Sequence, residues 1–255
     1  MKKLAAAFLS LLLAAGSAFA QAPSSFEPTF GQPGKDVIWV PTPQALVNQM
    51  LDMAKVTPAD FVMDLGSGDG RTVITAAKRG ATAVGVEYNP DMVEFSKRNA
   101  EKEGLGAKAT FMQADIFQTD LSRASVITMF LLPSINVKLR PKILDLNPGT
   151  RVVSNTFTME EWQADEIVTL TPSQGCDASW CTALFWIVPA KVEGVHRIAQ
   201  GEVHFQQRFQ MLTGRLIADG RIATLEGRVR GEEITFTSGG KTYRGRMNGN
   251  TLELR

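Results

Sequence analysis

Short apolar runs alternate with segments of helical periodicity between residues 37 and 188. Runs of this length are typical of buried strands, whereas apolar residues at every third or fourth position indicate amphipathic helices. We predict strands at 61–65, 82–87, 109–113, 125–131, 151–154, 167–171 and 183–188. We predict helices at 43–55, 71–78, 90–103, 135–146 and 159–164. This alternation predicts a parallel sheet with helices on both faces, completed by an antiparallel hairpin of the last two strands.

Two prolines affect the expected helix boundaries. Pro43 suits the first turn of the helix at 43–55, and Thr42 can cap it. Pro141 lies inside the helix predicted at 135–146, where it kinks the helix or marks its true start.

The pattern changes after about residue 193. From residue 201 to 255, glycines separate short alternating runs without helical periodicity. Strands divided by glycines at this spacing predict an antiparallel meander or a small barrel. We therefore expect an extended lead-in at 21–36, an α/β domain at 37–192 and a small β domain at 193–255.

The first twenty residues have the pattern of a signal peptide. Lys2 and Lys3 precede an apolar run, and Ala18 and Ala20 flank Phe19 in a small-x-small cleavage site. The alternative is an uncleaved membrane anchor, although the run is shorter than the roughly 20 residues that span a bilayer. We expect an exported, periplasmic protein whose mature chain begins near Gln21.

Composition and charge argue against several classes of function. Without Lys2 and Lys3, 25 basic residues face 26 acidic ones, so no basic field favours nucleic acid. Cys176 and Cys181 form a disulfide over a hairpin loop in an oxidising compartment, or else they remain free thiols. Two cysteines and two distant histidines do not make a metal-ligand cluster. An envelope or membrane protein partner is compatible with export.

The most informative stretch is the sequence DLGSGDGR at 64–71, which follows the first predicted strand of the sheet. Glycines allow the backbone to turn sharply and to approach a ligand closely. A dinucleotide fingerprint requires a glycine at position 71, where Arg71 stands. A nicotinamide-dependent oxidoreductase is therefore disfavoured.

Two acids at the ends of neighbouring strands complete the expected nucleoside site. Asp64 orders the glycine turn or receives a ligand ammonium through water. Glu87 ends the second strand of the sheet, where an acid can accept hydrogen bonds from both ribose hydroxyls. Asp69 in the turn suits a cationic ligand better than a diphosphate.

This arrangement resembles the class I methyltransferases that use S-adenosylmethionine (SAM), which have a seven-stranded Rossmann-like sheet. The sequences VPTP at 40–43, GVE at 85–87, LLPS at 131–134 and RVVS at 151–154 are similar to the small methyltransferases related to the mitochondrial lysine methyltransferases that modify the c subunit of ATP synthase. The resemblance implies SAM as cofactor and a protein lysine as a possible methyl acceptor. The expected cofactor-binding residues are Thr42, Asp64, Gly66, Ser67, Gly68, Gly70, Glu87, Asp115 and Ile116.

The resemblance also assigns roles to residues after the third, fourth and fifth strands. Asp115 hydrogen-bonds the adenine amino group, and the backbone N–H of Ile116 contacts a ring nitrogen. For the acceptor channel we expect Phe130, Leu131, Leu132 and Asn155. An inactive SAM- or nucleoside-binding protein with the same fold is the alternative function, because SAM is made in the cytoplasm and the chain is expected to leave it.

Overall fold

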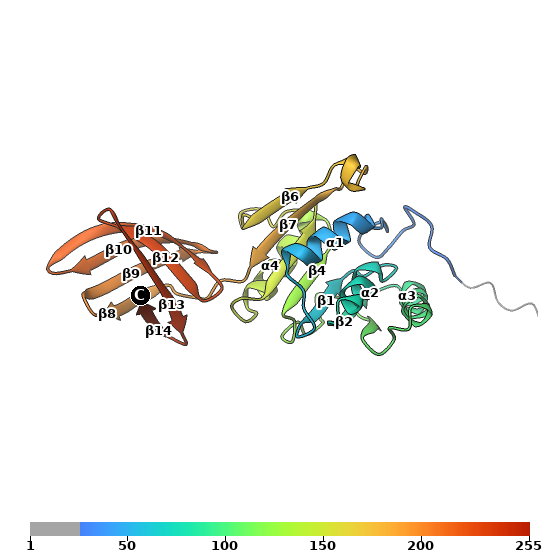
Figure 1. Cartoon of the computed structure of the whole chain (residues 1–255), viewed down its shortest axis with the longest axis horizontal. Coiled ribbons are helices and arrows are strands. Elements are labelled where there is room, and N and C mark those ends of the chain that lie inside the picture. Colours follow the sequence, from blue (N-terminus) through green and yellow to red (C-terminus); the bar gives the residue numbers. More distant parts are fainter. Residues whose placement is uncertain (1–25) are drawn as a thin grey trace, which may run out of the picture.

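The computed structural model describes residues 26–255, which form two sheets joined end to end (Figure 1). The predicted signal peptide at 1–20 lies outside the described residues. Within the described part of the chain, none of the helices combines the length and apolar character that spanning a bilayer requires.

The first sheet has seven strands in the order β3-β2-β1-β4-β5-β7-β6. All pairs are parallel except those of β7, which runs antiparallel to both β5 and β6. The strands are β1 (Phe61–Leu65), β2 (Thr82–Glu87), β3 (Ala109–Gln113), β4 (Val126–Met129), β5 (Arg151–Asn155), β6 (Glu166–Thr169) and β7 (Thr182–Ile187). The predicted α/β class and its closing antiparallel hairpin are confirmed.

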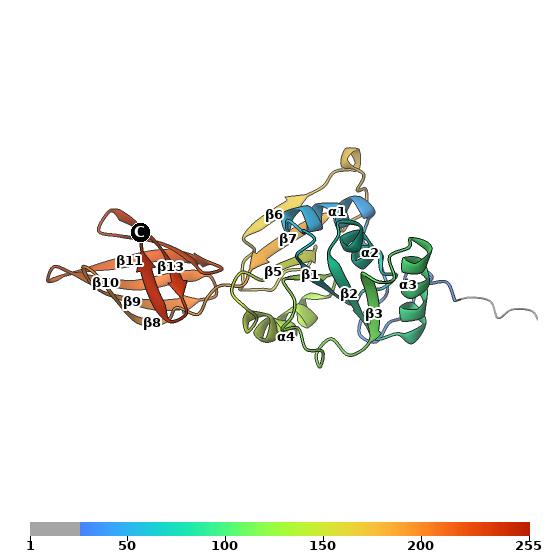
Figure 2. The same cartoon turned by 60° about the horizontal axis from the view of Figure 1, so that its bottom comes forward.

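Helices cover both faces of this sheet (Figure 2). The helices α1 (Gln44–Met53), α2 (Arg71–Lys78) and α3 (Pro90–Lys102) pack with one face of the sheet in a continuous apolar cluster. The helix α4 (Pro133–Leu144) packs with the opposite face, where Leu139 and Ile143 lie in a second cluster. The carboxyl ends of β1, β2 and β4 therefore emerge between the two helical layers.

One predicted helix is absent, one of the two alternatives for Pro141 is excluded, and α1 begins after Pro43 without a side-chain cap from Thr42. Residues 159–164 form a turn in which Met159 and Trp162 make an isolated bridge, and Glu160 has a φ of 54°. Trp162 is fully buried, so packing rather than helical periodicity determines this short segment. Pro141 does not mark a helix start, since α4 begins at Pro133 and continues through it.

The second sheet is an antiparallel meander of seven strands in sequence order, and β14 also contacts β8. Its strands are β8 (Gly194–Ile198), β9 (Gly201–Arg208), β10 (Met211–Ala218), β11 (Arg221–Arg230), β12 (Glu233–Ser238), β13 (Lys241–Asn248) and β14 (Thr251–Leu254). Alternate side chains such as Phe205, Leu225 and Phe236 fill its interior as a third apolar cluster. This near-barrel is the small β domain that the glycine-divided pattern predicts.

The near-barrel is attached at the amino edge of the first sheet. Arg228 pairs with Asp165, whose side chain is only 3% exposed, and Arg230 pairs with Glu166 at the start of β6. The ring of Phe209 stacks on Trp162 with 6.2 Å between ring centroids. These contacts seat the β domain on the edge opposite the carboxyl ends of the strands.

Candidate active site

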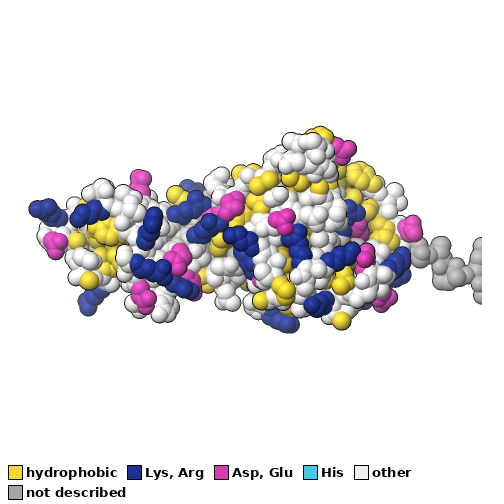
Figure 3. Space-filling view, in the orientation of Figure 1, with side chains coloured by type: hydrophobic (Ala, Val, Ile, Leu, Met, Phe, Trp, Pro, Cys, Tyr) yellow, Lys and Arg dark blue, Asp and Glu magenta, His cyan; other side chains and the backbone are white. Residues whose placement is uncertain are grey.

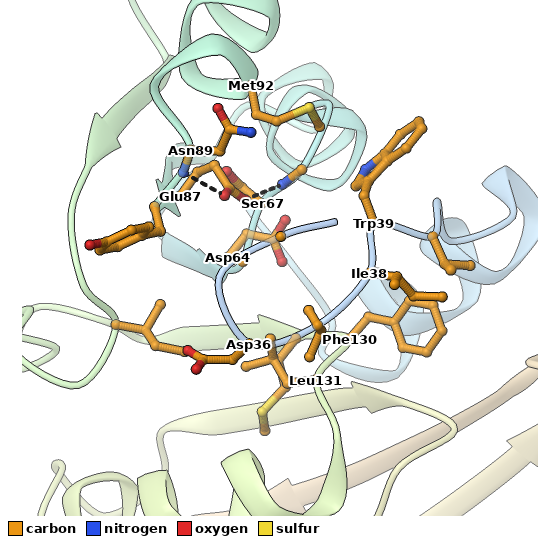
Figure 4. Close-up of a pocket in the computed structure, with 18 of the residues that line it drawn as sticks. Asp36, Ile38, Trp39, Asp64, Ser67, Glu87, Asn89, Met92, Phe130 and Leu131 are labelled. Atoms are coloured by element: carbon orange, nitrogen blue, oxygen red, sulfur yellow. Dashed lines mark hydrogen bonds between the residues drawn. The ribbon is translucent and has the colours of Figure 1, made fainter. Parts of the chain in front are cut away.

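A cavity of about 550 Å³ lies at the carboxyl ends of β1, β2 and β4. The segment at 32–42, which includes the end of the lead-in, forms one wall, and the glycine turn after β1 forms another. Figure 4 shows Asp64 and Glu87 on one side of the cavity and Ile38 and Phe130 on the other. The cavity therefore has an acidic end and an apolar end.

The glycine turn approaches its neighbours too closely for side chains. Gly66, Gly68 and Gly70 all have positive φ, and Gly70 lies at the start of α2. A Cβ at Gly68 would lie 2.6 Å from Nε1 of Trp39. This backbone conformation and this clearance both require glycine. Gly66 and Gly68 line the cavity, whereas Gly70 lies behind the turn, where a Cβ would meet Phe111.

Glu87 connects the second strand to the glycine turn. Its Oε2 accepts the backbone N–H of Gly68 at 3.1 Å, and its Oε1 accepts that of Asn89 at 2.9 Å (Figure 4). Each carboxylate oxygen keeps capacity for a further bond. The glutamate is thus oriented to accept hydroxyl donors from a ligand in the cavity.

Asp64 is the most perturbed acid of the site. Its carboxyl group is buried and accepts the hydroxyl of Thr128 at 2.6 Å. Burial, together with the negative charges of Asp69 and Glu87, raises the pKa of Asp64 to about 7. A cationic ligand would relieve this effect by stabilising the ionised form.

Asp115, which follows β3, also lines the cavity and contacts the lead-in. Its Oδ2 accepts Lys35 Nζ at 2.8 Å, and its Oδ1 accepts the backbone N–H of Phe117 at 2.8 Å. The hydrogen bond from Lys35 holds the pKa of Asp115 below its ordinary value. The ammonium of Lys35 also lies 4.3 Å from the ring centroid of Tyr88. Ile116 lines the cavity next to Asp115.

Arg71 connects the segment before α1 with the glycine turn. Its guanidinium donates to both oxygens of Asp69 and, at 2.9 Å, to the carbonyl of Thr42. Asn155 is fully buried and donates to Thr42 Oγ1 at 3.2 Å. Thr42 lines the cavity, but Asn155 lies behind it and contacts the site through Thr42.

The apolar end of the cavity contains the expected acceptor-channel residues Phe130, Leu131 and Leu132. Phe130 stacks on Phe157 with 5.7 Å between ring centroids. Leu131 is nearly buried, whereas Leu132 is 41% exposed at the start of α4. The aromatic pair therefore gives this end a flat apolar wall.

Sequence reasoning missed several residues that line the cavity, among them Lys35, Trp39, Tyr88, Met92, Phe157 and Trp180. A tryptophan in an apolar run beside VPTP could have indicated the role of Trp39. For Trp180, the only indication in the sequence is its position next to Cys181. For the others, the sequence around each residue contains no pattern that we can connect with a ligand.

The residues of this cavity fit SAM. Its volume lies within the range of about 300–1,000 Å³ usual for small-molecule sites. Each carboxylate oxygen of Glu87 accepts one backbone N–H and keeps capacity for a ligand hydroxyl. The acids at one end suit the positive charges of SAM. The glycine turn allows its own backbone N–H groups to approach the cofactor closely.

Comparisons with known proteins agree with this geometry. The family model of the ANTKMT methyltransferase domain matches residues 64–166. A protein-lysine N-methyltransferase of Saccharolobus islandicus is 45% identical over 135 residues, which cover 52% of this chain and 84% of that protein. The human lysine N-methyltransferase of the ATP synthase c subunit is 33% identical over 143 residues, covering 56% of this chain and 59% of that protein.

A solved structure adds the cofactor class. A protein from Salinibacter ruber, described as an RNA methyltransferase in complex with S-adenosyl-L-homocysteine, superposes with a TM-score of 0.55 and 43% identity. The superposition covers 60% of this chain and 96% of that one. None of these matches extends over the whole chain. In its α/β domain, the chain is a class I SAM-dependent methyltransferase of the family that contains the ANTKMT domain and the lysine methyltransferases of the ATP synthase c subunit.

Proposed function

We propose that this enzyme methylates the ε-amino group of a lysine in an envelope protein after export from the cytoplasm. The observation that carries the choice of lysine is the aromatic wall of Phe130 and Phe157 at the apolar end of the cofactor cavity. Such a wall contacts the aliphatic stem of lysine, and its ring faces attract an ammonium group. Relatives named protein-lysine N-methyltransferases support the same acceptor class.

The protein's task in this reaction is alignment. Bound SAM supplies an electrophilic methyl group on a sulfonium. The lysine nitrogen forms a bond to the methyl carbon as the carbon–sulfur bond breaks, the electron pair remains on sulfur, and one proton leaves the nitrogen. Glu87, Asp64 and the glycine turn would hold the cofactor, while Phe130 and its neighbours would direct the acceptor in line.

One feature of the described residues supports the proposal that the protein is exported. Cys176 and Cys181 form a disulfide. Disulfides persist in oxidising compartments and are rare in the cytosol of mesophiles. Together with the signal-peptide pattern at 1–20, this bond supports a mature periplasmic enzyme.

Charge argues against RNA as the acceptor, although one structural neighbour is described as an RNA methyltransferase. On the face shown in Figure 3, basic side chains are scattered over both domains with acidic ones between them. Affinity for RNA depends largely on phosphate contacts with clustered basic groups. We therefore propose a protein acceptor.

The test uses protein purified from cells that express the full chain. An N-terminus at Gln21 and recovery in the periplasmic fraction are the results expected for export, and an uncleaved cytoplasmic product would refute it. Methyl-labelled SAM is then incubated with envelope proteins and, separately, with total RNA. Methyl-lysine in hydrolysed protein is the expected product, with Glu87→Ala as the cofactor-binding control. Label in RNA or in another amino acid would refute lysine as the acceptor.

A further inference from the structure

The loop between β6 and β7 carries the disulfide to the side of the cavity. The loop begins with the short helix η1 (Pro172–Gln174), and Cys176 and Cys181 close a ring of six residues after it. Cys176 is 1% exposed and Cys181 is 5% exposed, and both belong to the apolar cluster that contains α1. The disulfide therefore fixes the base of the loop in the core of the α/β domain.

Trp180 precedes the second cysteine and reaches the apolar end of the cavity. Its ring centroid lies 6.5 Å from that of Phe130 and 6.2 Å from that of Phe30, on which it stacks. Phe130 in turn stacks on Phe157. Trp180 thus adds another aromatic side chain to the wall that would receive the acceptor.

One property of Trp180 points to a cationic ligand. The indole lines the cavity and offers the aromatic face that attracts cations most strongly. Its Nε1 is inaccessible to solvent, so the ring face and not the N–H is the part that an acceptor would contact.

Little besides the disulfide and ring stacking holds Trp180. Residues 177–180 make no backbone–backbone hydrogen bond within the described part of the chain. The flanking residues Cys176 and Cys181 are both tied to the start of the loop, by hydrogen bonds with Thr171 and Leu170. Without the disulfide, four residues with no backbone hydrogen bonds of their own would separate these two anchors.

We propose that Trp180 is an acceptor-binding residue of the methyltransferase and that the Cys176–Cys181 disulfide is what positions it. The proposal rests on the proposed function, because the cation–π contact requires a cationic acceptor such as lysine. It adds a dependence of acceptor use on the oxidised state of the loop. Cofactor binding does not share this dependence, because Trp180 stacks at the apolar end of the cavity and Glu87 lies at the acidic end.

The experiment compares the full-length enzyme with Trp180→Ala, Trp180→Phe and the double variant Cys176→Ala/Cys181→Ala. Ile222→Ala is a matched apolar control, since Ile222 is 68% exposed on the β domain. Methyl transfer to envelope proteins gives KM for the acceptor, and calorimetry with S-adenosylhomocysteine gives cofactor affinity. The part of the fluorescence that Trp180→Phe loses is assigned to Trp180. Quenching of that part by iodide reports how well the indole is shielded from solvent.

We expect the acceptor KM to rise about tenfold in Trp180→Ala and less in Trp180→Phe, in line with the strength of a shielded cation–π contact. The double cysteine variant should show a raised KM and stronger quenching of Trp180. Cofactor affinity should stay within about twofold, which also shows that each variant is folded.

The outcomes separate this proposal from the choice of lysine. Label on another residue with a raised KM in Trp180→Ala would refute lysine and support Trp180. Label on lysine with an unchanged KM would overturn the role of Trp180 alone. Unchanged quenching after loss of the disulfide would overturn its positioning role, whichever acceptor carries the label.

Discussion

The raised pKa of Asp64 leads to a specific dependence of cofactor affinity on pH. Without ligand, the buried carboxyl group of Asp64 has a pKa of about 7, because burial and the charges of Asp69 and Glu87 oppose its ionisation. A cationic cofactor favours the ionised form. Binding near neutral pH should therefore release a proton, and affinity should increase as the pH rises through about 7.

The magnitude follows from the pKa. If the bound state keeps Asp64 ionised, the dissociation constant of SAM at pH 6 should be about tenfold that at pH 8. S-adenosylhomocysteine lacks the sulfonium charge but keeps the ammonium group, so we expect the same slope for it. Calorimetry in two buffers of different ionisation enthalpy should detect release of about half a proton at pH 7.

The variant Asp64→Asn is the control, since it removes the titrating group and keeps an oxygen that can accept from Thr128. We expect weaker binding in this variant and no slope between pH 6 and pH 8. A wild-type dissociation constant that does not change over this range, or the same slope in Asp64→Asn, would refute the reasoning.

The same shift has a consequence for the stability of the protein without cofactor. The ordinary pKa of the carboxyl is 3.8, so between this value and about 7 the folded state binds more protons than the unfolded state. Stability is therefore lost as the pH rises through this window, by up to about 4 kcal/mol. Thermal unfolding should show Asp64→Asn to be more stable than the wild type at pH 8, and the difference should shrink at pH 5.

Three further variants test the surrounding structure. In Glu87→Ala we expect a loss of SAM affinity of about tenfold or more, because a charge-assisted hydrogen bond to the turn disappears along with the expected ribose contact; unchanged affinity in calorimetry would exclude that contact. In Gly68→Ala, the added Cβ meets Trp39, so affinity should again fall about tenfold or more; tight binding would show that the turn can shift. In Asp165→Ala, the buried partner of Arg228 is removed, and urea unfolding should show a free energy of unfolding lower by about 2 kcal/mol. A decrease below about 0.5 kcal/mol would contradict a stabilising contact between the two domains at this ion pair.

Local spacing was enough to predict the acidic end of the cavity. The glycine turn and the strand-ending Asp64 and Glu87 lie within one β-α-β unit, where the positions of side chains follow from strand and turn geometry. Lys35 could not be predicted in this way, since its partner Asp115 is 80 residues distant. Such contacts depend on how the lead-in folds over the sheet.

Short segments gave the least reliable predictions. The six residues at 159–164 have helical spacing, but a helix of that length has little stability of its own. The buried ring of Trp162 packs against Trp186 and Phe209 instead, and this packing determines the turn. Trp180 was equally unpredictable, because its contacts arise only after the disulfide loop is placed beside the lead-in.

The seating of the near-barrel restricts what it can contribute to methylation. It contacts the amino edge of the first sheet, whereas the cofactor cavity opens at the carboxyl ends of the strands. The strand β1 has five residues, so the two edges are separated by about 17 Å. A partner held by the near-barrel would have to present the methyl-accepting group on an arm of at least about five extended residues to reach the cofactor cavity. Globular partners without such an arm would have to bind to the cavity rim directly.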